Sequence, residues 1–519
     1  MRAMWMLVAG FVTVGLCPCD RGQRPCEGAG KSADGTAQFN VTDSQGEPLP
    51  CRVHLLNSTG KPQKVPGQPF WNDHFVCAGR VAVTLVPGTY SWQIERGPEH
   101  ERVSGTVKVV SGKTVIVNTA LSRISSLRQA GWYSGDLHVH RPASDVPLLM
   151  QAEDLDFAPI IEWWNARGGG LKPVAETETT FDGHRVYQLR AGEDEREGGA
   201  LLYFGLNRPL DLSAKSREFP SPMRFVKQAR DRNKDVWIDI EKPFWWDVPT
   251  WLASGQMNSI GIANNHMCRN RMYENEAWGR PRDETRLPNP VGNGYWTQEI
   301  YYHALNAGIR LPPSAGSASG VLPNPVGYNR VYVYLGDQKL NGDSWFEALS
   351  RGQCFVTNGP LLRATAAGQL PGRSFKLSDG GSLEVTLEVT LTSNDPVSHV
   401  EVIHNGRVAS RIACGHVVHQ TLSTTLTITE PGWFLVRAIA DVDSTFRFAS
   451  TAPWYVEGPG NKSRISRTSS QFFLDWVDER IGRVRQNISD PAELRAVIEP
   501  HENARVFWQN RVQIANADL

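Results

Sequence analysis

An aspartate and two histidines alternate with two aliphatic residues in the segment GDLHVHRP, residues 135–142. In an extended chain successive side chains point to opposite faces, so Asp136, His138 and His140 share one face and Leu137 and Val139 the other. Two imidazoles aimed at one point, with a carboxylate nearby to fix a tautomer, suit a divalent metal ion. Two solvated histidines on a wet strand would show the same spacing, so both interpretations stay open here.

Other polar residues stand at the ends of apolar segments further along the chain. The segments RVYQLRAG, VWIDI and SIGIA read as strands, and ligands of α/β proteins bind beyond the carboxyl ends of strands. We therefore expect the polar residues that follow these segments to lie near the histidine pair. They are Glu193, Asp194, Glu241, Lys242, Asn265 and His266.

Tryptophan is the one residue type in clear excess. The chain has 17, and ten of them fall between Trp132 and Trp345. Trp163, Trp245 and Trp246 come at or just beyond strand ends, so we expect them to line a pocket for a flat ring, such as a sugar or an aromatic ester. Packing in the core is the alternative, and we favour it for Trp164.

Length and charge limit the classes of function. A chain of 519 residues is too long for one core and predicts several domains. Lysine plus arginine and aspartate plus glutamate both number 54, which gives no electrostatic reason to expect a nucleic acid or an anionic membrane as partner. A small molecule, a glycan or a peptide is the expected substrate, and no feature indicates an oligomeric state.

The first 22 residues have the pattern of an export signal. Arg2 precedes an apolar run that ends at Leu16, which is too short to span a bilayer comfortably. We expect an exported protein, periplasmic, cell-surface or secreted, with no membrane span after the signal is removed. Cys17 raises lipid anchoring as an alternative, but Leu16 stands where a lipoprotein signal needs a small residue.

The rest of the chain divides by its pattern of apolar residues into four parts. Residues 32–122 and 363–458 alternate short apolar runs with turn signals, which predicts two β-sandwiches, the second immunoglobulin-like. Residues 124–362 alternate strands and helices, which predicts a parallel α/β array. Residues 467–519 carry apolar residues at helical spacing and predict a helical tail. Export would permit a disulfide between Cys51 and Cys77.

Two parts of the chain resemble known families. DSQGEPLPCRVHL and LVPGTYSWQIERG are similar to the carboxypeptidase-regulatory-like, transthyretin-like modules of exported proteins. Over about residues 124–362 the chain resembles the PHP-type metallohydrolases, in the CehA/McbA-like branch around carbaryl hydrolase. The resemblance implies a distorted (β/α) barrel that holds one to three divalent ions and hydrolyses phosphoesters, esters or amides. The segments that carry it are GDLHVH, DFAPIIEWWN, RAGEDE, IEKPFWW, GSASG and RVYVYLG.

Only part of that family's metal site is present. Asp136, His138 and His140 match the first motif, and Glu193 matches the metal-bridging glutamate. His266 occupies the neighbourhood of a later ligand of the family. Three motifs depart from the family pattern: Thr-Asp-His-Asn is replaced by residues 162–165, His-Pro by residues 242–243, and Gly-Ser-Asp-x-His by residues 316–320.

The resemblance thus implies a reduced site. His138, His140, Glu193 and His266 are the expected ligands of one zinc, manganese or iron ion, because three protein ligands plus water suffice for catalysis. Asp136, Asp194, Glu241 and Lys242 are the expected catalytic or orienting groups, and Trp163, Trp245, Trp246 and Asn265 the expected substrate contacts. We expect a metal-dependent hydrolase. The alternative is an inactive PHP-like binding protein with a tryptophan-lined cleft for carbohydrate or peptide.

Overall fold

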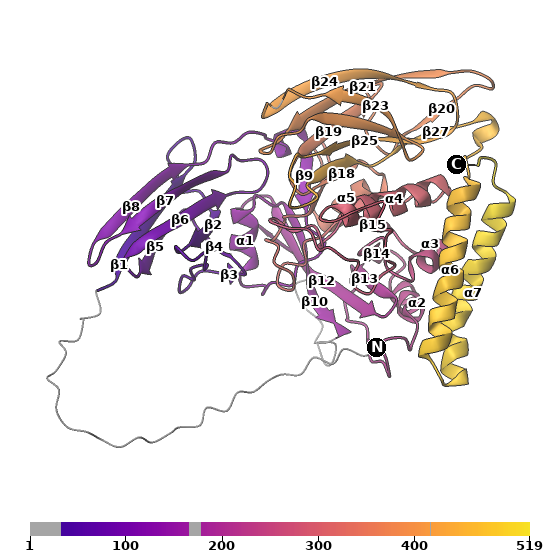
Figure 1. Ribbon diagram of the computed structural model, residues 1–519, viewed down its shortest axis with the longest axis horizontal. Helices are drawn as coiled ribbons and strands as arrows, with labels where there is room; N and C mark the ends of the chain where they lie inside the picture. Colours follow the sequence, from indigo (N-terminus) through magenta and orange to yellow (C-terminus); the bar gives the residue numbers. More distant parts are fainter. Residues whose placement is uncertain (1–32, 166–177, 416, 519) are drawn as a thin grey trace.

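The computed structural model describes residues 33–165, 178–415 and 417–518. The predicted export signal, residues 1–22, and Cys17 lie outside the described residues. Figure 1 shows a multidomain, β-rich chain with an N-terminal β domain, a central domain that carries most of the helices, a second β domain and a C-terminal helical pair. Within the described ranges, no helix has the length and apolar character needed to cross a bilayer.

The N-terminal domain is a sandwich of two sheets, as the turn spacing predicts. One sheet has the order β5-β1-β8 and the other β3-β4-β2-β6-β7. Cys51 and Cys77 face each other across β2 and β4, with free sulfurs 3.8 Å apart. The strands are β1 (Gly35–Thr42), β2 (Cys51–Leu56), β3 (Phe70–Trp71), β4 (His74–Cys77), β5 (Arg80–Leu85), β6 (Gly88–Glu95), β7 (Val103–Val109) and β8 (Thr114–Ala120).

The central domain is built on a mixed sheet, which corrects the expectation of a parallel array. β10 pairs in parallel with β9 and β12, and β14, β15 and β16 also run in parallel, but β13 is antiparallel to both β12 and β14. The short turn after β12 makes a hairpin, which forces this reversal. The strands are β9 (Trp132–Gly135), β10 (Phe157–Trp164), β11 (Glu178–Phe181), β12 (Arg185–Arg196), β13 (Gly199–Phe204), β14 (Trp237–Ile240), β15 (Ser259–Ala263), β16 (Pro313–Ala315), β17 (Arg330–Tyr334) and β18 (Cys354–Thr357).

Five α-helices and one 3₁₀ turn accompany this sheet in the described chain. Helix α3 begins at Val248, just after Trp245 and Trp246. Pro249 lies in its first turn, where the missing N–H has no cost, and Gly255 ends it in a left-handed conformation. The elements are η1 (Arg128–Ala130), α1 (Val146–Ala152), α2 (Pro222–Arg232), α3 (Val248–Ser254), α4 (Gly292–Asn306) and α5 (Gly342–Ser350).

The second β domain shares a sheet with the central domain. β18 pairs with β26, so the central sheet continues through β25 into β22 and β23, and a separate sheet of order β19-β21-β24 covers it. The expected boundary at residues 362–363 therefore falls within a strand, β19, of this covering sheet, and the central sheet runs on across it. The strands are β19 (Leu361–Ala366), β20 (Ser374–Lys376), β21 (Leu383–Thr392), β22 (His399–His404), β23 (Arg407–Ala413), β24 (His419–Ile428), β25 (Gly432–Ile439), β26 (Phe448–Thr451) and β27 (Trp454–Glu457).

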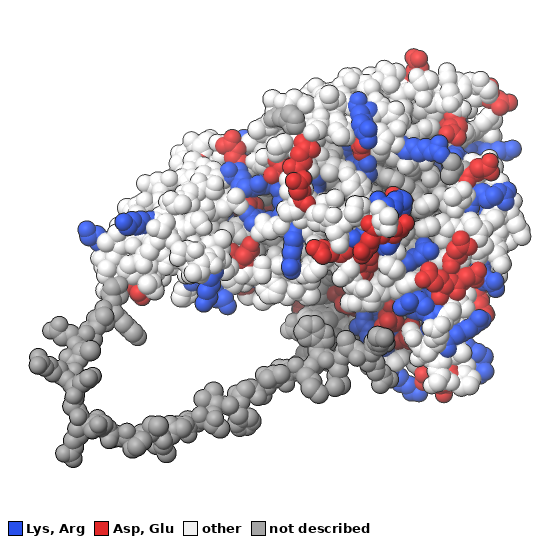
Figure 2. Space-filling model, viewed as in Figure 1, with Lys and Arg blue, Asp and Glu red and all other residues white. Residues whose placement is uncertain are grey.

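The helical tail consists of α6 (Arg467–Asn487) and α7 (Pro491–Gln513), after the 3₁₀ turn η3 (Pro459–Asn461). Asp490 caps α7 by accepting the amide hydrogens of Ala492 and Glu493. The pair lies against α3 and α4, on the edge of the molecule opposite the N-terminal sandwich (Figure 1). On the face shown in Figure 2, cationic and anionic side chains are interspersed, in line with the balanced composition.

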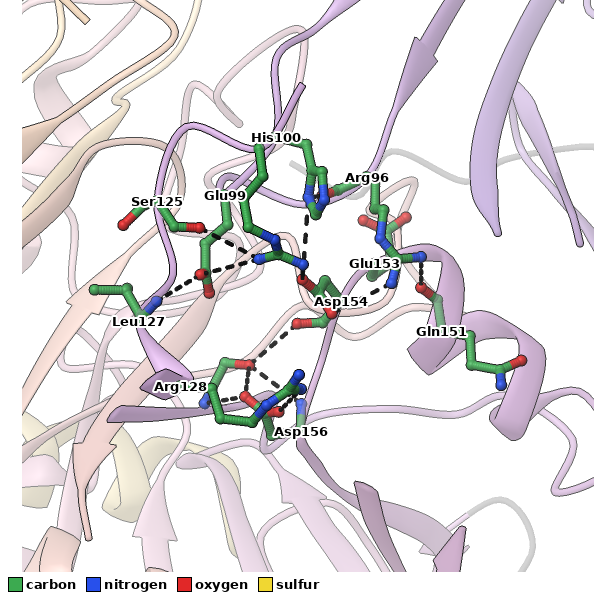
Figure 3. Close-up of polar contacts among 12 residues, drawn as sticks. Arg96, Glu99, His100, Ser125, Leu127, Arg128, Gln151, Glu153, Asp154 and Asp156 are labelled. Atoms are coloured by element: carbon green, nitrogen blue, oxygen red, sulfur yellow. Dashed lines mark hydrogen bonds and ion pairs between the residues drawn. The ribbon is translucent and has the colours of Figure 1, made fainter. Parts of the chain in front are cut away.

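A buried polar network joins the N-terminal sandwich to the central domain. Arg96 donates to the Gln151 carbonyl and to Asp154. Figure 3 shows Glu99 and His100 near Asp154 in the same network. Glu99 accepts the Leu127 amide at 2.8 Å and is 5% exposed. Burial, followed by the charge of Asp154, raises the pKa of Glu99 to about 7.

This raised pKa predicts a pH dependence of stability. The folded chain binds the Glu99 proton more tightly than the unfolded chain, so this stabilisation is complete below the ordinary carboxyl pKa and is lost as the pH rises through about 7. In Glu99→Gln the decrease in unfolding free energy between about pH 5 and about pH 8 should be smaller than in the wild type. Urea unfolding at a series of pH values measures both slopes, and equal slopes would contradict the assignment.

Candidate metal centre

The His-x-His segment is paired on both sides, because Val139 forms parallel bridges with Ile160 and Ser319. β9 ends at Gly135, and the chain continues extended between β10 and the segment after β16. Val139 accepts the Ile161 amide on one side at 2.8 Å, and on the other side His140 donates its amide to the Ser319 carbonyl at 2.8 Å. Both imidazoles are therefore fixed by backbone pairing on each side of the segment that carries them.

Asp136 anchors this segment through backbone amides. Its carboxylate accepts the amide hydrogens of His138 and Ser317, each at 3.0 Å, and of Gly327 at 2.7 Å. The side chain is fully buried, and burial raises its pKa while the three amides act in the opposite direction. Asp136 thus positions the histidines by holding the backbone, an orienting role exerted through amides and not through the imidazole rings.

Two glycines let the segment after β16 approach the histidines. A Cβ on Gly316 would lie 2.5 Å from Cβ of His138, and one on Gly320 would lie 2.6 Å from the His140 carbonyl oxygen. Ala318 lies between them with φ of 49°, a left-handed conformation that is strained for alanine. Residues 316–320 therefore pack closely against the backbone and Cβ atoms of both histidines.

Three ligand atoms converge at the floor of a cleft. Nε2 of His138 lies 2.9 Å from Nε2 of His140 and 3.4 Å from Oε2 of Glu193, and Nε2 of His140 lies 3.2 Å from that same oxygen. Bonds of about 2.0–2.2 Å to one ion would put ligand atoms about 3 Å apart, so the donor set fits zinc or a similar cation. The three side chains are each less than a tenth exposed.

Glu241 holds the other nitrogen of His138. Its Oε1 lies 3.4 Å from Nδ1 of His138, which directs Nε2 to the ligand cluster. Glu241 also accepts from Lys242 Nζ at 2.6 Å and from Trp245 Nε1 at 2.9 Å. Burial opposes ionisation of Glu241, but Lys242 and His138 outweigh it and lower the pKa of Glu241 to about 2. Glu241 is therefore an ionised group that orients His138.

His138 has the electrostatic surroundings of a cation site. Burial alone lowers the pKa of this imidazole, but Glu193 and Glu241 reverse that effect and raise the pKa to about 10. The Glu193 pKa is correspondingly held well below its usual range, against the effect of burial, by His138 and His140. The pocket thus favours positive charge between the two carboxylates, which a divalent ion bound there would supply.

Strand alternation in β12 separates the two neighbouring acids. Glu193 and Glu195 face the cleft, whereas Asp194 is buried on the other face and accepts from Arg196 at 2.6 Å and from Asn165 at 2.9 Å. Burial raises the pKa of Asp194 to about 6, although Arg196 opposes this. The expected catalytic role of Asp194 is therefore corrected. Glu195 was missed, although its position two residues after Glu193 was a usable signal.

Some of the tryptophans lie in the core and others line the cleft. Trp163 packs over Gly192, where a Cβ would lie 2.0 Å from the ring, and Trp246 is buried beneath Arg483 of α6, whose guanidinium carbon lies 4.2 Å from the ring centroid. Neither lines the cleft, which corrects their expected role as substrate contacts. Trp164 lines it instead, with its ring edge-on to His140 at 5.0 Å, so the packing role favoured for Trp164 is also corrected.

The cleft has a volume of about 610 Å³ and an aromatic wall. Trp245 lines it as expected, stacked on Trp278 with ring centroids 5.0 Å apart. Trp278 is 37% exposed at the rim and was missed, because it lies in an irregular loop without periodic pattern. The ammonium of Lys242 lies 4.6 Å from the Trp245 ring centroid. The wall therefore combines flat apolar faces with a fixed cation.

Asn265 and His266 also line the cleft but differ in role. Asn265 donates to Glu241, and its Oδ1 has no hydrogen-bond partner among the described residues, so it is available to a ligand. His266 packs between Phe244 and Tyr273 and is not among the three ligands that lie within 4.8 Å of one another. Burial and Lys242 lower the pKa of His266 to about 3. The expectation that His266 is a fourth ligand is therefore corrected to a neutral cleft wall.

A second cluster, His54, Asp73 and His74 in the N-terminal sandwich, has similar spacing but a different chemistry. Arg52 donates to Nε2 of His54 at 3.0 Å, so the proton of the neutral ring is on Nδ1, which faces Asp73 at 3.3 Å. A protonated nitrogen cannot bind a metal. This cluster is therefore a set of hydrogen bonds that stabilises the domain.

Comparisons with known proteins identify no relative that could assign a function. No family model and no curated protein matches the chain. Among solved structures, the chain shows similarity to the crystal structure of GBS52, the minor pilin of the Gram-positive pathogen Streptococcus agalactiae, at 16% identity. The match covers 18% of this chain and 46% of the pilin, with a TM-score of 0.16. A likeness of this size carries no argument about fold or function.

The amide contacts of Asp136 predict a large effect of a small substitution. Asp136→Asn places an NH₂ group against backbone N–H donors, so at least one buried donor loses its acceptor and the unfolding free energy should fall by about 1–3 kcal/mol. Urea unfolding measures the change. Asp379→Asn is the matched control, because Asp379 is exposed in a turn of the second β domain. Equal stabilities of the two variants would contradict the anchoring role.

Proposed function

We propose that the protein is an exported, metal-dependent hydrolase of ester, amide or phosphoester bonds with a reduced, single-ion site of the PHP type. The convergence of His138, His140 and Glu193 on one point at the floor of the cleft is the observation that carries this proposal. A divalent ion bound there supplies Lewis acidity and lowers the pKa of a water molecule toward about 7. Zinc, manganese and iron all suit two imidazoles and a carboxylate.

The surrounding residues have distinct tasks in this proposal. Glu241 orients His138, and Lys242 neutralises Glu241 while presenting a positive charge to a substrate oxygen. Glu195 shares the face of β12 with Glu193 and is placed to accept a proton. Asn265 offers an unpaired buried oxygen to a substrate N–H or O–H group. The stacked Trp245 and Trp278 bind a flat part of the substrate.

The fold gives this proposal further support. Residues 136–140 pair with β10 and with the segment after β16, and the candidate ligands come from these residues and from the end of β12. A distorted PHP-type barrel flanked by two β-sandwiches would have this arrangement. Catalytic groups that gather at the ends of barrel strands are typical of (β/α) barrel enzymes.

A metal-free binding protein is the second candidate, and a specific observation favours it. Trp164 lies against His140, and Lys242 pairs with Glu241, at positions where the PHP pattern has ligand histidines. A fixed ammonium and an indole can occupy the space of further ions. The cleft would then hold a carbohydrate or peptide against its tryptophans without transforming it.

Metal analysis of the purified chain separates the two candidates. The wild type should contain about one divalent ion per chain, and His138→Ala combined with His140→Ala should contain almost none, because two of three ligands are removed. Inductively coupled plasma mass spectrometry measures the content after exposure to zinc, manganese or iron. His399→Ala combined with His419→Ala is the matched control, since both histidines lie in the second β domain. Equal metal content in the two double variants would exclude the metal site.

Substrate contact at the cleft rim gives a second prediction. Trp278→Ala should lower kcat/KM for aromatic esters or phosphodiesters about tenfold, because a stacking face is lost. Trp246→Ala should instead lower stability, by about 3–5 kcal/mol, since that ring is buried away from the cleft. Steady-state kinetics with nitrophenyl esters and bis-nitrophenyl phosphate, with urea unfolding of each variant, would show the difference. An unchanged kcat/KM in Trp278→Ala would remove the aromatic wall from the proposed mechanism.

A further inference from the structure

A small cavity lies where the N-terminal sandwich, the central domain and the second β domain meet. Its volume is about 50 Å³, enough for a few water molecules or one small polyatomic ion. His100 and Glu153, which Figure 3 shows beside the interdomain network, are among its lining residues. Five guanidinium groups surround it, contributed by all three domains: Arg52, Arg102, Arg269, Arg330 and Arg447.

Three carboxylates line the same cavity and leave an excess of two positive charges. Glu95 is shared by three arginines, Asp395 by two, and Glu153 pairs with Arg52. Burial lowers the pKa of His100 to about 3, so this imidazole is neutral and adds no charge. The cavity is therefore electropositive and surrounded by forked donors that match the geometry of oxyanions.

Arg330 carries the argument, because it is buried and makes no direct ion pair with any described residue. Its charge acts on the nearby Glu153 and opposes the effect of burial, which raises the pKa of that carboxyl. The Arg330 side chain is among the largest with almost no exposure, and no carboxylate of the described residues lies within ion-pair distance of it. Nε donates to the Gly327 carbonyl and Nη2 to the Glu153 carbonyl at 3.1 Å, but Nη1 has no hydrogen-bond partner in the described chain. A buried charge with an unused donor is costly unless an anion or water satisfies it.

The unpaired Nη1 of Arg330 lies beside a residue of the cavity lining. Gly97, a lining residue, has φ of 58°, and a Cβ at that position would lie 3.3 Å from Nη1 of Arg330. Nε of Arg447, also in the lining, is a second buried donor without a partner among the described residues. Two unused guanidinium donors from different domains thus border one small electropositive space.

We propose that a small inorganic oxyanion of the phosphate or sulfate type binds in this cavity and links the three domains. The donors of Arg330 and Arg447 bind its oxygens, and the anion neutralises the excess charge. This site is separate from the metal centre and does not depend on the proposed hydrolase activity. Because the anion binds only when the three domains are assembled, it stabilises the folded chain by mass action.

Thermal unfolding of the full chain tests the proposal. Sodium sulfate and sodium phosphate, compared with sodium chloride at equal ionic strength, should raise Tm along a saturable curve in the millimolar range. Sulfate and phosphate also stabilise proteins by exclusion from the surface, but that effect rises without saturation at high concentration. In Arg330→Gln the saturable part should be lost. Arg224→Gln, at an exposed position of α2, should retain it.

A second variant and a direct observation cover the case in which Arg330→Gln does not fold. Arg102 is partly exposed at the edge of the cavity, so Arg102→Gln should fold and should weaken the apparent anion affinity at least threefold. Crystals grown with selenate should show an anomalous selenium peak beside Arg330. Saturable shifts that are equal in the wild type, Arg102→Gln and Arg330→Gln, or an absent peak at saturating selenate, would overturn the proposal.

Discussion

The candidate centre depends on a single buried carboxylate, that of Asp136. Three amide hydrogens from three chain segments converge on it, so the His-x-His segment, the loop after β16 and the turn before β17 are fixed relative to one another. Each of these bonds forms in a region without water, where an unpaired donor would be costly. The imidazoles of His138 and His140 meet because the backbone beneath them has little freedom left. A catalytic role for Asp136 would conflict with this use of both its oxygens.

Alternation along extended chain explains most of what the cleft contains. It directs Glu193 and Glu195 inward and Asp194 outward, and it separates Trp164 from Trp163. The same rule directs Leu137 and Val139, which flank His138 in the sequence, into the core. A polar floor and an apolar support therefore come from one short segment. The apolar side is as necessary as the polar one, since it fixes the register of that segment.

The sequence predicted the multidomain, β-rich architecture and the helical pair, because turn spacing and helical periodicity are local signals. It also identified His138, His140 and Glu193, whose convergence the structure supports. It did not predict the face on which each member of an adjacent pair lies, because a strand's phase depends on its partners. Trp163 in β10 was misplaced for this reason, whereas Trp246 lies in the segment between β14 and α3, where no strand period applies. The hairpin that makes β13 antiparallel depends on a short turn whose effect on topology is not visible in hydrophobic pattern alone.

The side chains and the loop around the three-ligand cluster leave little unpaired charge and little empty space beside it. Trp164 packs against His140, Lys242 binds Glu241, and the loop around Ala318 supports both histidines from below. An ammonium fixed on a carboxylate keeps the local charge that a second ion would bring, without the need to recruit that ion. Loss of outer ligands alone would leave unpaired carboxylates and voids, both of which destabilise a buried site. Here Glu241 is paired and the space is filled. The cluster of His138, His140 and Glu193 thus lies among paired charges and filled space, a setting that could hold one metal ion.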